Sequence, residues 1–263
     1  MINLKDTTFI IPLAIESQDR LNNSKTVLGF LNHHFNTNVI IHELTNGDSK
    51  LLFLDTFKNL NIKHIIEVSD LSIYHRTRQL NEMLDIVKTK VVVNYDIDVI
   101  LPINTYIKSS ELIINNDFDI IYPYGDGMYQ KRVFNTFDRK KFNTIFDLNY
   151  INENNCDMWN AKYGHCVFFN TEIYKKYGGE NENFIAYGPE DSERYERFLK
   201  IGCKISRIDD IIYHFEHYRT PFSNELNSFF EKNNILYNLL KSLDKQDTID
   251  YYNKVDYKKK YFN

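Results

Sequence analysis

Two aspartates, Asp96 and Asp98, follow an apolar run in the stretch VVVNYDIDVILP, residues 91 to 102. Carboxylates two residues apart can both turn toward a site at the carboxyl end of a strand, the edge at which open parallel sheets bind ligands. Their oxygens suit Mg²⁺ or Mn²⁺, which fill other positions with phosphate oxygens and water. The same residues could instead close a turn by accepting backbone hydrogen bonds, or include the nucleophile of a phosphohydrolase.

A second acidic pair, Glu190 and Asp191, follows Pro189 in the stretch AYGPEDSE. Proline in the first turn and acids near the amino end are typical of any helix start, so the pair could simply cap a helix. One of the two carboxylates could also take a proton from an attacking hydroxyl. The pattern alone leaves both interpretations open.

Arginines and histidines lie before and after these acids. Arg76 and Arg78, in YHRTRQLN, carry guanidinium groups that match diphosphate oxygens, although two arginines on a helix could equally face solvent. His214 and His217 lie three residues apart in YHFEHYR. Imidazole together with carboxylate oxygen suits Mn²⁺. The sequence does not separate the two histidines as metal ligands, and we prefer His214 slightly.

The elements that must position these residues alternate in the first part of the chain. Apolar runs predict strands, and apolar residues at helical spacing predict helices. The chain then reads as strand 7–15, helix 20–35, strands 38–44 and 62–68, helix 74–88 and strand 90–96. Such alternation predicts parallel strands covered by helices, hence an α/β fold.

The second part of the chain is less regular. It reads as helix 102–115, strand 118–124, an irregular stretch 126–160, strand 165–170, helix 190–202 and strand 204–215. Long irregular segments are often binding loops. Because no linker or composition break interrupts the chain, we predict one domain over residues 1–223 and a helical extension over 224–263.

Composition narrows the class of protein. With 43% hydrophobic and 26% charged residues and a net charge of -4, the 263-residue chain is an ordinary globular protein without bulk affinity for nucleic acid. No apolar run approaches the roughly 20 residues of a membrane span. The start resembles no signal peptide, and three cysteines lack metal-ligand spacing, so we expect a cytoplasmic location. The basic end, KKKYF, allows at most peripheral contact with the inner face of a membrane.

Four stretches together resemble the GT-A glycosyltransferases, and within them the β1,4-galactosyltransferase and chondroitin polymerase type. They are FIIPLAIESQDRL, YHRTRQLN, NYDIDVILP with its D-x-D motif, and the segment from YGHCVFFN through AYGPEDSE to YHFEHYR. The resemblance implies a GT-A, Rossmann-like mixed sheet flanked by helices. Its donor half would cover residues 1–101 and its acceptor half residues 102–223.

The resemblance also implies roles for particular residues on the donor side. The nucleotide base would meet the first strand and its loop, the uracil or ribose the end of the second strand, and the diphosphate the arginines. Asp98 would bind the metal directly, with Asp96 shared between ribose and metal and one of the two histidines completing the ligands. The implied donor-binding residues are Pro12, Leu13, Arg20, Glu43, Arg76, Arg78, Asp96, Gly164 and Tyr187.

On the acceptor side, Asp191 would be the catalytic base, with Glu190 beside it. Tyr187, Gly188 and Trp159 would bind the acceptor, although the single tryptophan could also fill the core. This chain has Gly188-Pro189 where the galactosyltransferases have two glycines, which puts the mobility of that loop in question.

The resulting prediction is a metal-dependent, inverting glycosyltransferase. It would use Mn²⁺ or Mg²⁺ to move a hexose, galactose or N-acetylgalactosamine, from a UDP-sugar to a glycan or lipid-linked oligosaccharide, in polysaccharide or oligosaccharide biosynthesis. The alternatives are a non-catalytic module that binds sugar nucleotides and an aspartate-nucleophile phosphohydrolase.

Overall fold

A mixed sheet forms the centre of the molecule. The computed structural model describes residues 1–69, 73–218 and 224–262. Within these residues, seven strands lie in the spatial order β10 (Ile205–Arg207), β6 (Ile120–Tyr122), β9 (Cys166–Asn170), β4 (Val91–Tyr95), β1 (Ile2–Ala14), β2 (Phe35–Thr45) and β3 (Leu60–Val68). Strands β4, β1, β2 and β3 are parallel, whereas β9 runs antiparallel to both β4 and β6.

A smaller sheet stands beside the first. In the described part of the chain its order is β5 (Val99–Ile100), β11 (Ile212–Phe215), β7 (Gly127–Val133) and β8 (Cys156–Ala161). Strand β11 pairs antiparallel with β5 and parallel with β7. This sheet therefore joins the end of the D-x-D stretch to β11, a strand more than a hundred residues later in the chain.

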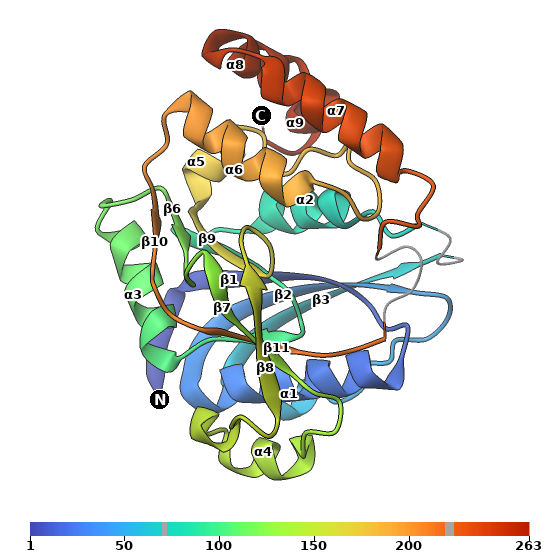
Figure 1. Cartoon of the computed structure of the whole chain (residues 1–263), viewed down its shortest axis with the longest axis vertical. Helices are drawn as coiled ribbons and strands as arrows, with labels where there is room; N and C mark the ends of the chain where they lie inside the picture. Colours follow the sequence, from blue (N-terminus) through green and yellow to red (C-terminus); the bar gives the residue numbers. More distant parts are fainter. Residues whose placement is uncertain (70–72, 219–223, 263) are drawn as a thin grey trace.

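Helices cover both sides of the sheets (Figure 1). In that view α1 and α4 lie on one side, and α2, α5 and α6 on the other, with α7, α8 and α9 beyond α6. Their bounds are α1 (Gln18–His34), α2 (Arg76–Ile86), α3 (Ile103–Ile114), α4 (Arg139–Ile145), α5 (Thr171–Lys176), α6 (Glu190–Ile201), α7 (Phe230–Ser242), α8 (Lys245–Lys254) and α9 (Asp256–Tyr261). Two short 3₁₀ turns are η1 (Leu54–Thr56) and η2 (Leu148–Tyr150). No helix in the described ranges is long and apolar enough to cross a membrane.

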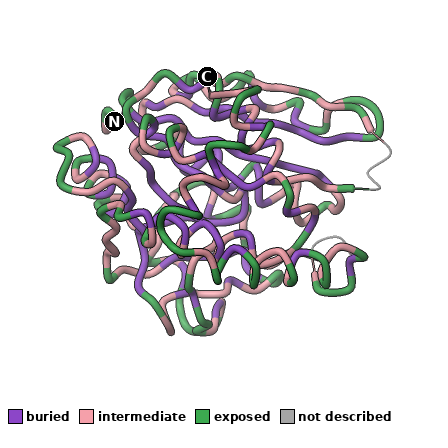
Figure 2. Tube along the Cα trace, turned by 90° about the horizontal axis from the view of Figure 1, so that it is seen from above, coloured by how far each residue is buried: buried purple, intermediate pink, exposed green. Residues whose placement is uncertain are grey.

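The first strand shows why the larger sheet forms. Residues Phe9, Ile10, Ile11 and Leu13 are fully buried, as expected for a parallel strand covered on both faces. Helix α1 begins at Ser17, whose side chain accepts a hydrogen bond from the backbone N–H of Arg20 at 3.2 Å, the usual cap of a helix start. Figure 2 shows the buried stretches gathered in the interior of the trace.

The predicted α/β fold is confirmed, and so are the predicted strands and helices of the first part of the chain. Two predictions about the second part were wrong. The stretch 126–160, expected to be irregular, contains β7, α4 and most of β8, and the single strand expected over 204–215 is split between the two sheets as β10 and β11. Between the two strands, Asp210 accepts a hydrogen bond from the Thr105 hydroxyl through its side chain and one from the Gly125 N–H through its carbonyl.

The last described segment is helical, as predicted. Helices α7 and α8 pack against α6, and the Lys200 ammonium of α6 donates hydrogen bonds to the carbonyls of Leu240, Lys241 and Leu243 at the end of α7. The predicted boundary between residues 223 and 224 falls at the edge of a segment outside the described residues.

Candidate functional site

Most of the predicted site residues line one pocket of about 340 Å³. It lies where β4, β11, the start of α6 and the loop before β9 meet. The predicted residues that line it are Pro12, Arg20, Arg76, Asp96, Asp98, Trp159, Gly164, Tyr187, Glu190, Asp191, His214 and His217. Residues between Pro12 and His217, far apart in the sequence, therefore converge on one cavity.

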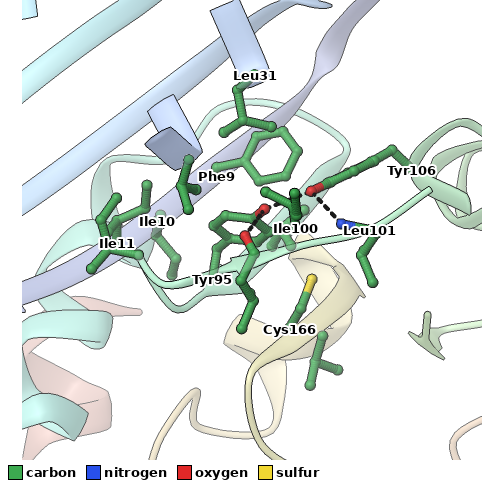
Figure 3. Close-up of a cluster of buried hydrophobic side chains, with 14 of the residues drawn as sticks. Phe9, Ile10, Ile11, Leu31, Tyr95, Ile100, Leu101, Tyr106 and Cys166 are labelled. Carbon is green, nitrogen blue, oxygen red and sulfur yellow. Dashed lines mark hydrogen bonds between the residues drawn. The ribbon is translucent and has the colours of Figure 1, made fainter. Parts of the chain in front are cut away.

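Buried tyrosines fix the turn that carries the two aspartates (Figure 3). The Tyr95 hydroxyl, at the end of β4, donates a hydrogen bond to the carbonyl of Val99 at 2.6 Å and lies 2.6 Å from the Tyr106 hydroxyl. The backbone N–H of Leu101 donates to Tyr106 at 3.0 Å. These bonds tie β4 to β5, and the residues between the two strands, Asp96, Ile97 and Asp98, line the pocket.

Asp98, His214 and His217 form a carboxylate–imidazole cluster. Strand pairing brings them together, since His214 lies opposite Val99 and the Phe215 N–H donates to the Asp98 carbonyl at 2.8 Å. His217 Nε2 lies 3.0 Å from Asp98 Oδ2, and His214 Nε2 lies 3.8 Å from Asp98 Oδ1. One ligand atom from each residue lies within 4.8 Å of the others. Such a set can hold a metal ion.

Arg20 and the two histidines surround the Asp98 carboxylate, which is only 4% exposed. Burial alone would raise the pKa of Asp98, but His214, His217 and Arg20 together hold that pKa below its ordinary value. Arg20 Nη1 lies 3.9 Å from Asp98 Oδ2. The carboxylate is therefore kept in the charged form that metal binding requires.

Asp96 has a different partner. Its carboxylate accepts a hydrogen bond from Arg76 Nη2 at 2.8 Å, and it is not part of the cluster around Asp98. Arg76 Nη1 lies 3.7 Å from Asp191 Oδ1. Arg76 thus lies between the two acidic stretches that the sequence singles out.

A buried ion network positions Asp191. Arg194 Nη2 lies 2.7 Å from Asp191 Oδ1, and Arg194 Nη1 donates to Glu180 Oε1 at 2.8 Å. Glu180 also accepts hydrogen bonds from Asn94 at 2.6 Å and from the Tyr174 hydroxyl. Because Arg194 and Glu180 are each about 1% exposed, this pair fixes the orientation of the Asp191 carboxylate from beneath.

Glu190 lies deeper than Asp191. It is 7% exposed, whereas the Asp191 side chain is 29% exposed. Burial, reinforced by the neighbouring Asp191 carboxylate, raises the pKa of Glu190 to about 8. At neutral pH Glu190 is therefore largely protonated.

The loops around the acidic pair approach it closely. A Cβ added at Gly164 would lie 2.9 Å from Asp191 Oδ2, so a larger residue there would displace the Asp191 carboxylate. The next residue, His165, has a positive φ of 69° and accepts a hydrogen bond from the Asp96 N–H at 2.8 Å through its carbonyl. Trp159 and Tyr187, 51% and 38% exposed, form the open rim of the pocket.

Four predicted site residues are not among the described residues that line the pocket. Leu13 points into the core, because successive side chains of β1 face opposite ways and Pro12 takes the pocket side. Glu43 is fully buried and accepts hydrogen bonds from Ser49, the Lys50 N–H and His64, which close the turn after β2. Arg78 pairs with Glu67 and Glu82. Gly188 packs instead against Asn233.

Sequence reasoning missed other residues that line the pocket: Tyr74, Ile97, Gln130, Asn160 and Ala186; it noted His165, which also lines the pocket, only as a residue that could narrow it. His165 Nε2 lies 3.0 Å from Gln130 Oε1, so a strand of the smaller sheet meets the loop before β9. Gln130 lies in the stretch that the sequence left irregular, and no local pattern marks it. Tyr74 lies two residues before the predicted Arg76, and that proximity in the sequence was the signal that could have found it.

Comparisons with known proteins agree on the fold. A family model described as the N-terminal domain of galactosyltransferase matches residues 148–220. The mannosyltransferase PcManGT from Pyrobaculum calidifontis, in complex with GDP-Man and Mn²⁺, is 13% identical with a TM-score of 0.52, covering 80% of this chain and 56% of its own. No curated protein matches the chain in sequence.

Two further solved structures are similar. S. aureus TarS 1–349, in complex with UDP-GlcNAc, is 12% identical with a TM-score of 0.57, covering 93% of this chain and 69% of its own. A Drosophila β1,4-galactosyltransferase 7 variant, in complex with manganese, UDP-Gal and xylobiose, is 11% identical with a TM-score of 0.52, covering 89% and 79%. The chain spans only about half of PcManGT and 41% of a longer TarS chain. The resemblance seen in the sequence is confirmed: this chain has the GT-A fold of the glycosyltransferases.

Proposed function

We propose that this protein is a metal-dependent, inverting glycosyltransferase that moves a hexose, galactose or N-acetylgalactosamine, from a UDP-sugar to a glycan hydroxyl. One observation carries the proposal. A single pocket is lined by the carboxylate–imidazole cluster of Asp98 and by the Asp191 carboxylate, and Arg76, in the same pocket, pairs with both Asp96 and Asp191. Similar folds bind sugar nucleotides, and two of them were solved with manganese.

The residues present fit a divalent ion. Asp98, His214 and His217 offer one carboxylate oxygen and two imidazole nitrogens within 4.8 Å, a donor set that suits Mn²⁺ better than Ca²⁺. Both histidines are near Asp98, so we propose that both, together with Asp98, hold the ion. When bound, the ion would supply positive charge that stabilises a leaving diphosphate.

The chain's own side chains would also stabilise the diphosphate and take the proton from the acceptor. Arg20 and Arg76 face the same pocket and would offset the charge of the diphosphate. Asp191 would accept the proton of the acceptor hydroxyl as its oxygen attacks the anomeric carbon and the bond to the diphosphate breaks, releasing UDP. Because Glu190 is largely protonated at neutral pH, Asp191 is the better candidate for the base.

The rim residues would hold the acceptor. Trp159 and Tyr187 present aromatic faces at the mouth of the pocket, and such faces stack on sugar rings. A glycan or lipid-linked oligosaccharide acceptor, polysaccharide or oligosaccharide biosynthesis and a cytoplasmic location with at most peripheral membrane contact stay predictions. So does the absence of nucleic acid among the partners.

The single tryptophan makes the proposal testable. Because Trp159 is the only tryptophan and lines the pocket, its fluorescence should report the binding of UDP with Mn²⁺. We expect UDP to bind more tightly than GDP or dTDP, and UDP-galactose or UDP-N-acetylgalactosamine to support transfer or slow hydrolysis. A clear preference for GDP would overturn the donor assignment.

The Asp191→Asn variant separates catalysis from binding. It should abolish transfer while UDP binding stays within about twofold of the wild type, because the donor side of the pocket is unchanged. A non-catalytic module predicts UDP binding without turnover in the wild type. The phosphohydrolase alternative, which the GT-A fold disfavours, predicts phosphate release from p-nitrophenyl phosphate. Unchanged turnover in Asp191→Asn would remove the role assigned to that residue.

A further inference from the structure

The loop over residues 185–188 connects the pocket to the start of α6. It carries Tyr187, which lines the pocket, and it leads directly to the acidic pair at the start of the helix. Ala186 has a φ of 57°, a left-handed conformation that costs about 1 kcal/mol or more for a residue other than glycine. Such a backbone persists only when its surroundings hold it.

Asn233 of helix α7 holds this loop. The side chain is 1% exposed, and its amide donates hydrogen bonds to the carbonyls of Ile185 at 2.8 Å and Tyr187 at 3.3 Å. Its oxygen accepts from the Ile185 N–H at 3.4 Å. One side chain thus satisfies both backbone groups of Ile185, in place of a neighbouring strand.

Asn227, just before α7, and Phe230, at its start, also contact the loop over residues 185–188. The Asn227 amide donates to the Tyr187 carbonyl at 2.9 Å, and the Phe230 ring stacks on the Tyr187 ring with centroids 6.1 Å apart and an interplanar angle of 15°. A Cβ added at Gly188 would lie 2.7 Å from the Asn233 amide nitrogen. Gly188 therefore allows the helix to approach the loop.

Helix α7 is anchored independently of the loop. Figure 1 shows it running beside α6, and Tyr237 donates a hydrogen bond to Glu196 of α6 at 2.7 Å. Lys200 of α6 binds the carbonyls at the end of α7. Since these contacts do not involve residues 185–188, removing the Asn233 amide should loosen the loop without detaching the helix.

We infer that Asn233 is a positioning residue of the active site: it holds the loop of Tyr187, and with it the acceptor side of the pocket, in its working conformation. The inference rests on the proposed function and deepens it, because it makes helix α7 part of the site rather than an appendage. Asn233 does not line the pocket itself and acts through Ile185 and Tyr187.

The test compares Asn233→Ala with a matched control, Tyr237→Phe. Both variants remove hydrogen bonds made by α7, but only the first touches the loop. With UDP-galactose, Mn²⁺ and a panel of soluble mono- and disaccharide acceptors, we expect kcat/KM for the acceptor to fall about tenfold or more in Asn233→Ala. The same parameter in Tyr237→Phe, and the Kd for UDP measured by Trp159 fluorescence in both variants, should stay within about twofold.

Hydrogen exchange tests the positioning without any substrate. We expect faster amide exchange across residues 183–189 in Asn233→Ala, and unchanged exchange there in Tyr237→Phe, because the Ile185 N–H loses its acceptor only in the first variant. Phe230→Leu, which removes the stacking on Tyr187, should shift exchange and acceptor kcat/KM in the same direction by a smaller factor.

The possible results test the role of Asn233 separately from the proposed function. Equal behaviour of Asn233→Ala and Tyr237→Phe in exchange and in acceptor kinetics would overturn the role of Asn233. A parallel loss of UDP binding in Asn233→Ala would also overturn it, since the effect would then not be confined to the acceptor side of the pocket. Absence of transfer and hydrolysis in the wild type would instead contradict the proposed function, and exchange across the loop would still decide whether Asn233 positions it.

Discussion

Two groups of carboxylates and histidines lie in the described part of the chain, and they differ in what surrounds them. The first, Asp98 with His214 and His217, is the pocket cluster. The second, His42 with Glu67 and Glu82, is the β2–α2 cluster. In both, ligand atoms lie within 4.8 Å of one another, so compactness alone does not distinguish a metal site from a structural network.

The β2–α2 cluster already contains its counter-ion. Arg78 donates to both oxygens of Glu67 at 2.6 and 2.7 Å and to Glu82 at 2.9 Å, while His42 lies 3.2 Å from Glu67 and 3.4 Å from Glu82. In the pocket cluster, Arg20 is more loosely placed, 3.9 Å from Asp98 and 3.3 Å from His217 Nε2, and the cluster opens on the pocket. We therefore expect the pocket cluster to serve function and the β2–α2 cluster to serve stability.

The largest effect should follow from Asp98→Asn. Removing the only carboxylate of the pocket cluster should lower Mn²⁺-dependent turnover by about a hundredfold or more. Turnover of UDP-galactose measures this, with circular dichroism to check folding. The matched change in the other cluster, Glu67→Gln, should leave turnover within about threefold. Similar losses in both variants would erase the distinction between the clusters.

Replacing single histidines should also distinguish the two clusters, with a smaller effect than Asp98→Asn. His214→Gln and His217→Gln should each weaken Mn²⁺ binding by roughly tenfold to a hundredfold, because each removes one donor near Asp98. His42→Gln should leave Mn²⁺ affinity unchanged. Titration of Mn²⁺, followed by electron paramagnetic resonance, would measure all three. A loss of Mn²⁺ affinity in His42→Gln would instead assign the metal site to the β2–α2 cluster.

Arg78→Met should affect stability rather than donor binding. Without its guanidinium, Glu67 and Glu82 repel each other, and the free energy of unfolding should fall by about 1 to 2 kcal/mol, since the groups are partly exposed. Urea unfolding measures the change. If instead the Kd for UDP rose more than about fivefold, Arg78 would belong to the donor site after all.

The smallest effect is a pH dependence of the β2–α2 cluster. Burial, which outweighs the attraction of Glu82 and Glu67, lowers the pKa of His42 below its ordinary value of 6.5. The unfolded chain then binds the proton more readily, so the free energy of unfolding falls as the pH drops below 6.5, by at most about 1.4 kcal/mol per unit.

Comparison with His42→Gln isolates this contribution. His34 and His75, whose pKa values are also lowered, keep their contributions in the variant, so the difference between the two slopes belongs to His42. Identical slopes between pH 5 and 6.5 would mean that His42 gains no proton on unfolding.

Residues with strong local patterns were predictable from the sequence. The buried strand containing Phe9 and Ile10 and the helix that begins after Pro189 follow from apolar runs and helix-start chemistry. The candidates Asp98, Asp191, His214 and His217 were found from residue type and resemblance. Arg78 also fitted the pattern of a diphosphate-binding arginine, but it does not line the pocket. It pairs with Glu67, eleven residues earlier, and the local sequence around Arg78 does not indicate that pairing.

The sequence by itself determined the α/β alternation, the acids available for chemistry and the GT-A resemblance. Only the tertiary structure decided which acids act together. The pairing of β5 with β11 places two histidines near Asp98. Asp96 instead pairs with Arg76, and Asn233 donates a hydrogen bond to the loop that carries Tyr187. The physical reason is range: periodicity and capping act over a few residues, whereas these contacts join segments twenty to more than a hundred residues apart.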